Sequence, residues 1–320
     1  MITRRCFDQN DRIPEKIRQR LVEDCSREDS LTLDVIYGKP GSVFYEARNR
    51  MIKFMNSLYI NGFNRFEVPF MSVLLTQKCT LRCSHCSDLM PYYSNPVHFS
   101  YKEVFFYLKK YLSVVDHVHF LLLCGGETFL YPQLDKVLAY CIREKKIRKI
   151  GIVTNGTVMP TENVCKLLGT SKVRVRVSDY DCVKKKREET IQNLEKYGII
   201  IENLKGQKWY DVGGFEKRNR SNRQLQQLFR ECSMNRCFEI NKSKVIYCAR
   251  QRSGELGLTP EISRQDYVSL KTRDAYSLRK SLLNMYDKKF LMTCDYCDGI
   301  TRRSIQVTAG EQVHISGRTP

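Results

Sequence analysis

Three cysteines lie close together in the first third of the sequence, in the segment Cys79-Thr-Leu-Arg-Cys83-Ser-His-Cys86. Thiolates are soft ligands that bind zinc ions and iron–sulfur clusters. A structural zinc site needs four ligands, and His85, between two of the cysteines, is poorly placed to turn back and complete one. Three thiolates on a 4Fe–4S cluster would instead leave one iron open to a substrate or cosubstrate. The segment therefore predicts a reactive metal site.

Five cysteines beyond residue 230 are candidates for a second metal site. They are Cys232, Cys237, Cys248, Cys294 and Cys297. Residues 237–248 are predicted to form a β-hairpin with a polar turn, which would bring Cys237 and Cys248 together. Cys294 and Cys297 have a spacing found in both zinc and iron–sulfur sites. We expect Cys237, Cys248, Cys294 and Cys297 to be the ligands, with Cys232 as the alternative to Cys237. The alternative to an iron–sulfur cluster is a structural zinc ion that holds the hairpin together.

Short apolar, β-branched runs alternate with amphipathic helices from residue 67 onward. The predicted strands cover residues 68–76, 118–123, 150–154, 173–177 and 199–204, and the predicted helices cover residues 101–112, 134–144, 162–168 and 188–197. This alternation is typical of βα units around a parallel sheet. A sixth strand is possible, so the sequence predicts an α/β fold with a partial (β/α)6, TIM-like barrel.

Polar segments follow several of these strands. The cysteine segment follows the first strand, Gly125-Gly126-Glu127 the second, Asn155 the third and Ser178-Asp179-Tyr180 the fourth. The carboxyl ends of parallel barrel strands meet on one face, where active sites of such barrels lie. We therefore expect all four segments to converge on one site.

The paired motifs resemble those of the radical S-adenosylmethionine (radical SAM) enzymes. That family carries a C-x3-C-x-aromatic-C signature and a Gly-Gly-Glu motif after the second strand, and this chain has both in the same order. His85 takes the usually aromatic position, and its ring could still stack on adenine. The resemblance covers about residues 67–204.

The resemblance implies that Cys79, Cys83 and Cys86 hold a 4Fe–4S cluster whose open iron binds S-adenosylmethionine. Reductive cleavage of that cosubstrate would give a 5′-deoxyadenosyl radical, which takes a hydrogen atom from the substrate. It also implies an external electron donor such as flavodoxin or ferredoxin. The cluster would be strongly reducing, with a reduction potential near the low end of the range known for protein iron–sulfur clusters.

The same resemblance assigns roles to residues on the other loops. Glu127 would accept a hydrogen bond from the ammonium group of S-adenosylmethionine. Gly125 and Gly126 would let the backbone approach the cosubstrate closely. Asn155 and Ser178 would contact its ribose or carboxylate.

The C-terminal cysteines resemble the twitch domain of the SPASM/twitch branch of these enzymes, a β-hairpin plus helix that holds one auxiliary 4Fe–4S cluster. The chain would then carry two clusters, the second suited to accept an electron from a substrate radical. We expect an N-terminal helical extension at residues 1–65, the barrel at 66–230, the twitch domain at 231–302 with a helix near 264–286, and a frayed polar tail at 303–320.

The compact C-terminal cysteine arrangement is similar to that of a twitch dehydrogenase acting on an aminocyclitol alcohol. We therefore expect an oxidoreductase that oxidises a secondary alcohol of a sugar-like or cyclitol molecule, with Asp179, Tyr180 and Asp181 as candidate bases. The alternative is radical modification of a ribosomally made peptide, by epimerisation or cross-linking. Residues 1–65 lack a convincing winged-helix peptide-binding module, which counts against that alternative.

The composition of the 320 residues, 42% hydrophobic with a net charge of +19, fits a globular chain with a large core. There is neither a run of 18 apolar residues nor a secretory signal, so we expect a cytoplasmic protein without membrane contact. An RNA-binding protein with structural metal sites is a further alternative, based on the basic runs 184–187, 217–220 and 302–303. Because the basic residues are dispersed and lack interleaved aromatic residues, nucleic acid is an improbable partner.

Overall fold

The structure, a computed structural model, describes residues 66–203, 206 and 208–313. The expected helical extension at residues 1–65 lies outside the described residues. Among the residues described, no helix is long and apolar enough to cross a membrane.

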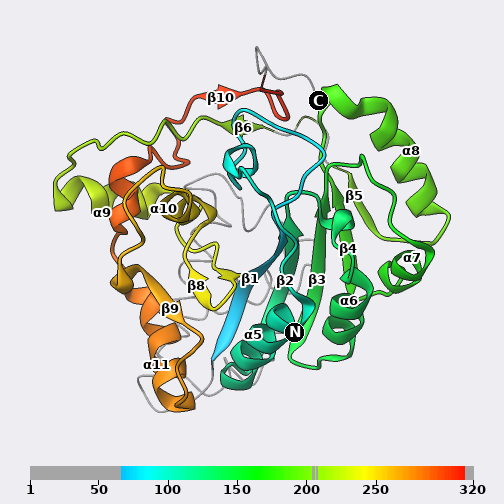
Figure 1. The fold of residues 1–320 in the computed structure, drawn as a ribbon, viewed down its shortest axis with the longest axis horizontal. Coiled ribbons are helices and arrows are strands. Elements are labelled where there is room, and N and C mark those ends of the chain that lie inside the picture. The colour runs from blue at the N-terminus through cyan, green and yellow to red at the C-terminus, as the bar shows by residue number, and fades with distance from the viewer. Residues whose placement is uncertain (1–65, 204–205, 207, 314–320) are drawn as a thin grey trace, which may run out of the picture.

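One sheet of eight strands, in the order β5-β4-β3-β2-β1-β7-β8-β9, organises the fold (Figure 1). Its strands are β1 (Glu67–Thr76), β2 (His117–Gly125), β3 (Ile147–Thr154), β4 (Val173–Val177), β5 (Ile201–Asn203), β7 (Glu239–Asn241), β8 (Lys244–Ile246) and β9 (Tyr267–Ser269). The strands from β5 to β7 run parallel, and β8 and β9 are antiparallel. The predicted α/β class with a mostly parallel, partial barrel is confirmed.

The sixth parallel strand comes from the C-terminal part of the chain. β7 pairs with β1, where Ser72 lies opposite Glu239, rather than extending the sheet beyond β5. The hairpin β7–β8 turns at Lys242, which has a positive φ of 51°. The predicted barrel and twitch segments therefore share one continuous sheet, and the proposed boundary at residue 230 remains a prediction.

Helices α5 (Tyr101–Val114), α6 (Leu134–Arg143), α7 (Glu162–Leu168) and α8 (Lys184–Glu195) cover the outer side of the barrel strands (Figure 1). The C-terminal part adds α9 (Asn222–Glu231), α10 (Arg252–Glu255) and α11 (Ala275–Asn284). The helix expected near residues 264–286 is shorter than predicted. Its first part forms a 3-10 turn and strand β9, because residues 267–269 pair with the free edge of β8.

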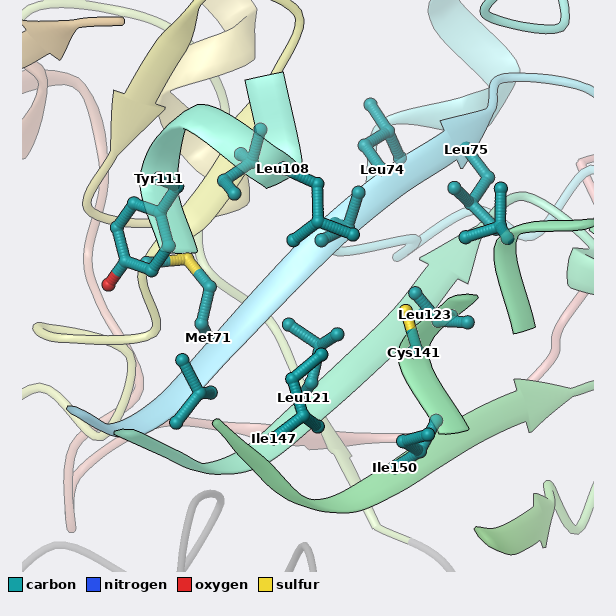
Figure 2. Packing of buried hydrophobic residues seen from close by; sticks show 14 of the residues in the cluster. Met71, Leu74, Leu75, Leu108, Tyr111, Leu121, Leu123, Cys141, Ile147 and Ile150 are labelled. Atoms are coloured by element: carbon teal, nitrogen blue, oxygen red, sulfur yellow. The ribbon is translucent and has the colours of Figure 1, made fainter. Parts of the chain in front are cut away.

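The main core lies between these helices and the outer face of the sheet. Figure 2 shows Met71 of β1 close to Tyr111 of α5, and Leu121 of β2 beside Ile147 of β3. These four side chains are at most 1% exposed. At about 25 cal/mol per Å² of apolar surface removed from water, such burial supplies most of the stabilisation that holds the strand ends in place.

The opposite face of the sheet points into the barrel. Alternate residues of neighbouring strands form a separate apolar cluster there, made of Phe70, Phe120, Leu122 and Cys237. The rings of Phe70 and Phe120 stack with centroids 6.2 Å apart. This cluster fills the barrel below the carboxyl ends of the strands.

Candidate metal centres and cosubstrate site

The first cysteine segment forms a loop directly after β1, at the carboxyl edge of the sheet. Cys83 is buried, and Cys79 and Cys86 are partly buried. Nitrogen donors point at two of the sulfurs: Leu81 N lies 3.4 Å from Cys79 Sγ, and Gln312 Nε2 lies 3.3 Å from Cys83 Sγ. Hydrogen bonds of this kind stabilise negative charge on sulfur.

Burial acts in the opposite direction on these thiols. It raises the pKa of Cys79 to about 11 and the pKa of Cys86 to about 12. Thiolate ligands of metals are deprotonated because the bound cations stabilise their charge. The loop thus offers three sulfurs that need a positive metal centre in order to ionise.

Gly125 and Gly126 lie against this loop, and the predicted close approach of their backbone to the cosubstrate stays a prediction. A Cβ at Gly125 would lie 2.5 Å from Thr76 O, and a Cβ at Gly126 would lie 2.4 Å from Lys78 O and 2.8 Å from Cys79 Cβ. Gly126 N also donates to Thr76 O over 3.0 Å. The paired glycines therefore let the end of β2 pack directly on the start of the cysteine loop.

The Glu127 side chain is fully buried and is enclosed by hydrogen bonds. Its Oε1 accepts from Phe129 N and from Thr154 Oγ1, at 3.0 and 2.9 Å, and its Oε2 accepts from Asn155 N at 2.8 Å. Burial raises the pKa of Glu127 to about 7, although these three bonds favour the charged form. The carboxylate thus fixes the end of β3 to the end of β2. Its predicted role as acceptor for the cosubstrate's ammonium group stays a prediction.

Asn155, at the end of β3, reaches back to the cysteine loop. Its Nδ2 donates to Thr80 Oγ1 over 3.0 Å and lies 3.7 Å from Cys79 Sγ, while its Oδ1 accepts from Thr157 N. Asn155 therefore joins the third strand end to the loop of the first.

His85 and Ser178 lie elsewhere at this edge. His85 is partly exposed, and its Nδ1 lies 3.8 Å from Asp211 Oδ1. Ser178 is buried, and its carbonyl accepts from Arg187 Nε over 2.7 Å. Their predicted contacts with the cosubstrate stay predictions.

The three candidate bases occupy different environments. Asp179 forms an ion pair with Arg187, with Oδ1 and Nη1 3.5 Å apart. Tyr180 is buried against Trp209, and burial raises its pKa far above the usual value. Asp181 is exposed and lines an open, partly polar pocket together with Cys182. The three side chains therefore differ in their surroundings, and the role of base stays a prediction for each.

A C-terminal strap, residues 304–313, crosses the cysteine loop where we expected a frayed tail. Strand β10 (Gln306–Val307) pairs with β6 (Trp209–Tyr210), and the two run side by side in Figure 1. Further along, Ser84 N donates to Glu311 O and Val313 N donates to Arg82 O, at 2.8 and 2.7 Å. Backbone hydrogen bonds explain why this polar segment has a defined conformation, which composition alone does not predict.

Gln312 is the strap residue that reaches a candidate metal ligand, and sequence reasoning missed it. Besides its contact with Cys83, its Oε1 accepts from Arg82 N over 2.8 Å. Gln312 lies 229 positions from Cys83, so no local spacing signal could have revealed it.

Replacing Gln312 by alanine should loosen the cysteine loop and speed the loss of iron from the reconstituted protein to a chelator. The lost amide contacts are worth about 0.5–1.5 kcal/mol each. The exposed Gln306, on the same strap, supplies the control variant Gln306→Ala. Equal rates of iron release from the two variants would contradict a role for the Gln312 amide.

The second group of cysteines surrounds one apolar cavity of about 60 Å³, which has room for several water-sized groups. Its sulfur-bearing lining consists of Cys232, Cys248, Cys294 and Cys297, together with Met234. Gly299 N lies 3.3 Å from Cys297 Sγ, and Ile300 N lies 3.4 Å from Cys232 Sγ. Four thiols thus face one space, with backbone donors on two of them.

Cys237, which we expected among these ligands, lies elsewhere. It belongs to the apolar cluster inside the barrel with Phe70 and Phe120, and its Sγ is 3.8 Å from Ser233 O. It lies two residues before the first residue of β7, Glu239, so the alternation of the extended chain turns its side chain into the barrel. Cys232, at the end of α9, takes the place that the hairpin pattern assigned to Cys237.

No three Cys, His, Asp or Glu side chains among the described residues are close enough to hold a single metal ion. In a 4Fe–4S cluster each thiolate binds a different iron, so its ligands stand around a larger space. A cavity framed by four sulfurs is the arrangement such a cluster needs.

Comparisons with known proteins agree with this geometry. The Radical SAM superfamily profile matches residues 73–200. The antilisterial bacteriocin subtilosin biosynthesis protein AlbA of Bacillus subtilis is 30% identical over 126 residues, which are 38% of this chain and 26% of AlbA. A GTP 3′,8-cyclase of Aliarcobacter butzleri is 27% identical over 151 residues, which are 47% of this chain and 44% of the cyclase. The matches therefore span less than half of either relative.

Solved structures resemble this chain only at low similarity. Native anSMEcpe with bound AdoMet gives a TM-score of 0.47 at 14% identity, covering 73% of this chain and 89% of that one. Streptococcus suis SuiB bound to S-adenosylmethionine gives a TM-score of 0.35 at 16% identity, and the match covers 51% of this chain and 38% of SuiB. Residues 73–200, which contain both the cysteine loop and the Gly-Gly-Glu motif, are therefore a radical SAM superfamily domain.

Proposed function

We propose that this chain is a radical SAM oxidoreductase of the auxiliary-cluster type that oxidises an alcohol of a polar small molecule. The proposal depends most on one observation, the cavity framed by Cys232, Cys248, Cys294 and Cys297. A net oxidation requires an acceptor for the electron that the substrate radical loses, and a second cluster beside the barrel would be that acceptor. One 4Fe–4S cluster would be held at each group of cysteines.

Cys79, Cys83 and Cys86 would hold the first cluster. When bound there, the cluster and S-adenosylmethionine supply a radical that removes a hydrogen atom from the substrate. The residues of this chain position and shield that pair. Gly126 and Glu127 fix the loop to the second and third strands, and the strap covers it from the side of Cys83.

The second cavity fits an auxiliary cluster because its lining is almost entirely apolar apart from the four sulfurs. Burial raises the pKa of Cys232 and of Cys294 to about 12, so metal cations must stabilise these thiolates. The amides of Gly299 and Ile300 add hydrogen bonds to sulfur, a feature that tunes cluster potential. This arrangement supports the predicted twitch function for residues 231–302, with Cys232 in place of Cys237.

An external electron donor belongs to this proposal. The net charge of +19 favours an acidic redox protein, such as a flavodoxin or a ferredoxin, because opposite charges speed association. The same charge gives little support to RNA binding. Arg187, in one of the basic runs, is buried and bonded to Ser178 O, so this run is not a continuous surface patch.

Peptide modification is the second candidate function. The likeness to AlbA, whose name connects that protein with bacteriocin biosynthesis, favours it. The likeness to GTP 3′,8-cyclases favours a small-molecule substrate instead. We place the small molecule first because the buried charged side chains of Glu239 and Arg252, 3.6 Å apart, lie on the inner side of the sheet.

Cys232→Ser and Cys237→Ser form a matched pair that tests the auxiliary site. After anaerobic reconstitution, the unaltered protein should hold roughly eight irons per chain. Cys232→Ser should hold roughly four, because a cluster that loses one of four thiolates is unstable, whereas Cys237→Ser should keep roughly eight. Iron and sulfide assays with Mössbauer spectroscopy measure this. Zinc in place of the missing iron, or the opposite behaviour of the pair, would refute the auxiliary cluster as proposed.

A further inference from the structure

The lining of the second cavity includes a charged residue, Arg250, beside the four sulfurs. Arg250 lies two positions after Cys248, in a short 3-10 turn. Gln251 fixes this turn, because its side chain is fully buried, accepts from Tyr247 N over 2.7 Å and donates to Asp266 O over 2.8 Å. The backbone that carries Arg250 is therefore held in place at the edge of the cavity.

One end of the Arg250 guanidinium group is fixed by a neighbouring loop. Its Nη2 donates to Gly213 O over 2.9 Å and to Gly214 O over 2.6 Å. The guanidinium carbon lies 4.0 Å from the centroid of the Phe215 ring, which is a cation–π contact. The Phe215 ring in turn packs edge to face with Tyr92, with centroids 5.2 Å apart. These contacts restrict the rotation of the guanidinium group.

The Nε atom of the same group is buried and has no hydrogen-bond partner among the described residues. Buried donors are normally paired, because an open one has lost its bonds to water without replacing them. The inorganic sulfides of an iron–sulfur cluster accept hydrogen bonds from N–H groups. A cluster in the cavity that Arg250 lines would therefore supply the missing acceptor.

The positive charge of Arg250 also acts on one of the candidate ligands. Burial raises the pKa of the Cys297 thiol, and the charge of Arg250 is the largest of the effects that oppose this rise. Asp298, the residue after Cys297, forms ion pairs with Arg218 and Arg220. No carboxylate of the described residues pairs with Arg250, so its charge is not neutralised in this way.

A fixed charge and a fixed donor of this kind shift the reduction potential of a cluster. A 4Fe–4S cluster held by four thiolates has a net negative charge, which increases when the cluster takes up an electron. Positive charge and N–H donors stabilise the reduced form more than the oxidised form, so they raise the potential. The amides of Gly299 and Ile300 act in the same direction on two of the thiolates.

We propose that Arg250 donates a hydrogen bond from Nε to a sulfide of the auxiliary cluster and raises the reduction potential of that cluster. This inference rests on the proposed function, in which the second cluster accepts the electron that the substrate radical loses. Arg250 keeps its proton throughout. It changes only the equilibrium between the oxidised and the reduced cluster.

Arg250→Met and Arg250→Gln form a matched pair that tests the proposal. Both new side chains reach the position of Nε, where glutamine keeps an N–H donor and methionine places a methyl group. The measurement is a redox titration of the cluster-loaded protein, followed by electron paramagnetic resonance. The second cluster is the one whose signal does not change when S-adenosylmethionine is added.

Arg250→Met should lower the equilibrium constant for one-electron reduction of the second cluster about tenfold, the value of a hydrogen bond from a charged group. For one electron this corresponds to a fall of about 59 mV in potential. Arg250→Gln should lower the constant less, because the donor remains. Arg223→Met is the control, because Arg223 is exposed on α9 and does not line the cavity, so it should leave the potential unchanged.

Three results would overturn the proposal while the second cluster is present in the unaltered protein. Arg250→Met could behave like the control, both variants at position 250 could lower the constant equally, or both could lose the iron of the second cluster. The last result would mean that Arg250 is needed only to build the site. If the unaltered protein holds no second cluster at all, the iron content refutes the proposed function itself, and this inference falls with it.

Discussion

Alanine at Cys79, Cys83 and Cys86 together should abolish the formation of 5′-deoxyadenosine from S-adenosylmethionine while leaving the second metal centre in place. The three sulfurs belong to one loop at the carboxyl edge of the sheet, and the sulfurs of the second cavity come from other segments. Removing the first set therefore takes away the cluster that binds the cosubstrate, and the other four thiols remain. Chromatography of the nucleoside products under anaerobic, reducing conditions measures the loss. Iron should fall from roughly eight to roughly four per chain.

Cys141 and Cys165 provide the matched control for this triple variant. Both thiols are fully buried in the main core, away from either cysteine site. Replacing these two by alanine removes small apolar groups, so it should lower stability modestly and leave both iron content and nucleoside formation unchanged. If the triple variant still forms 5′-deoxyadenosine, the assignment of the first cluster is wrong.

Elements with a strong periodic pattern could be predicted from the sequence. β4 and α7 have the predicted bounds, and β1 differs from its prediction by one residue. Each combines an apolar face with clear boundary residues, such as Thr161, whose side chain caps α7 by accepting from Val164 N. The convergence of the strand-end loops on one edge followed from the parallel order of the strands.

Features that depend on contacts between distant segments could not be read from the sequence. The partner of β7 is β1, about 170 residues earlier, and no local pattern encodes that pairing. The strap has low hydrophobicity, yet its backbone bonds hold it against residues 82–84. Cys232 and Cys237 are equivalent by spacing, and only the packing of Phe70 beside Cys237 distinguishes them.

Glu127 to alanine should destabilise the protein itself, before any cosubstrate is bound. The carboxylate accepts three hydrogen bonds from Phe129, Thr154 and Asn155 in a fully buried position. Truncation leaves these donors unpaired at a cost of about 1–3 kcal/mol each, partly relieved by relaxation. We expect a total loss of about 3–5 kcal/mol and a fall of roughly 10 °C in the unfolding midpoint. Thermal unfolding without S-adenosylmethionine measures it.

Two further variants separate this positioning role from direct binding of the cosubstrate. Glu188→Ala removes an exposed carboxylate on α8 and should leave the midpoint unchanged. Glu127→Gln keeps the size of the side chain but turns one acceptor into a donor. Its unfolding midpoint should therefore lie between those of the unaltered protein and Glu127→Ala. An unchanged midpoint in Glu127→Ala, together with weaker S-adenosylmethionine binding, would mean that the main role of Glu127 is the contact with the ammonium group. A large drop means that the third residue of the Gly-Gly-Glu motif acts here by tying the second and third strands to the cysteine loop.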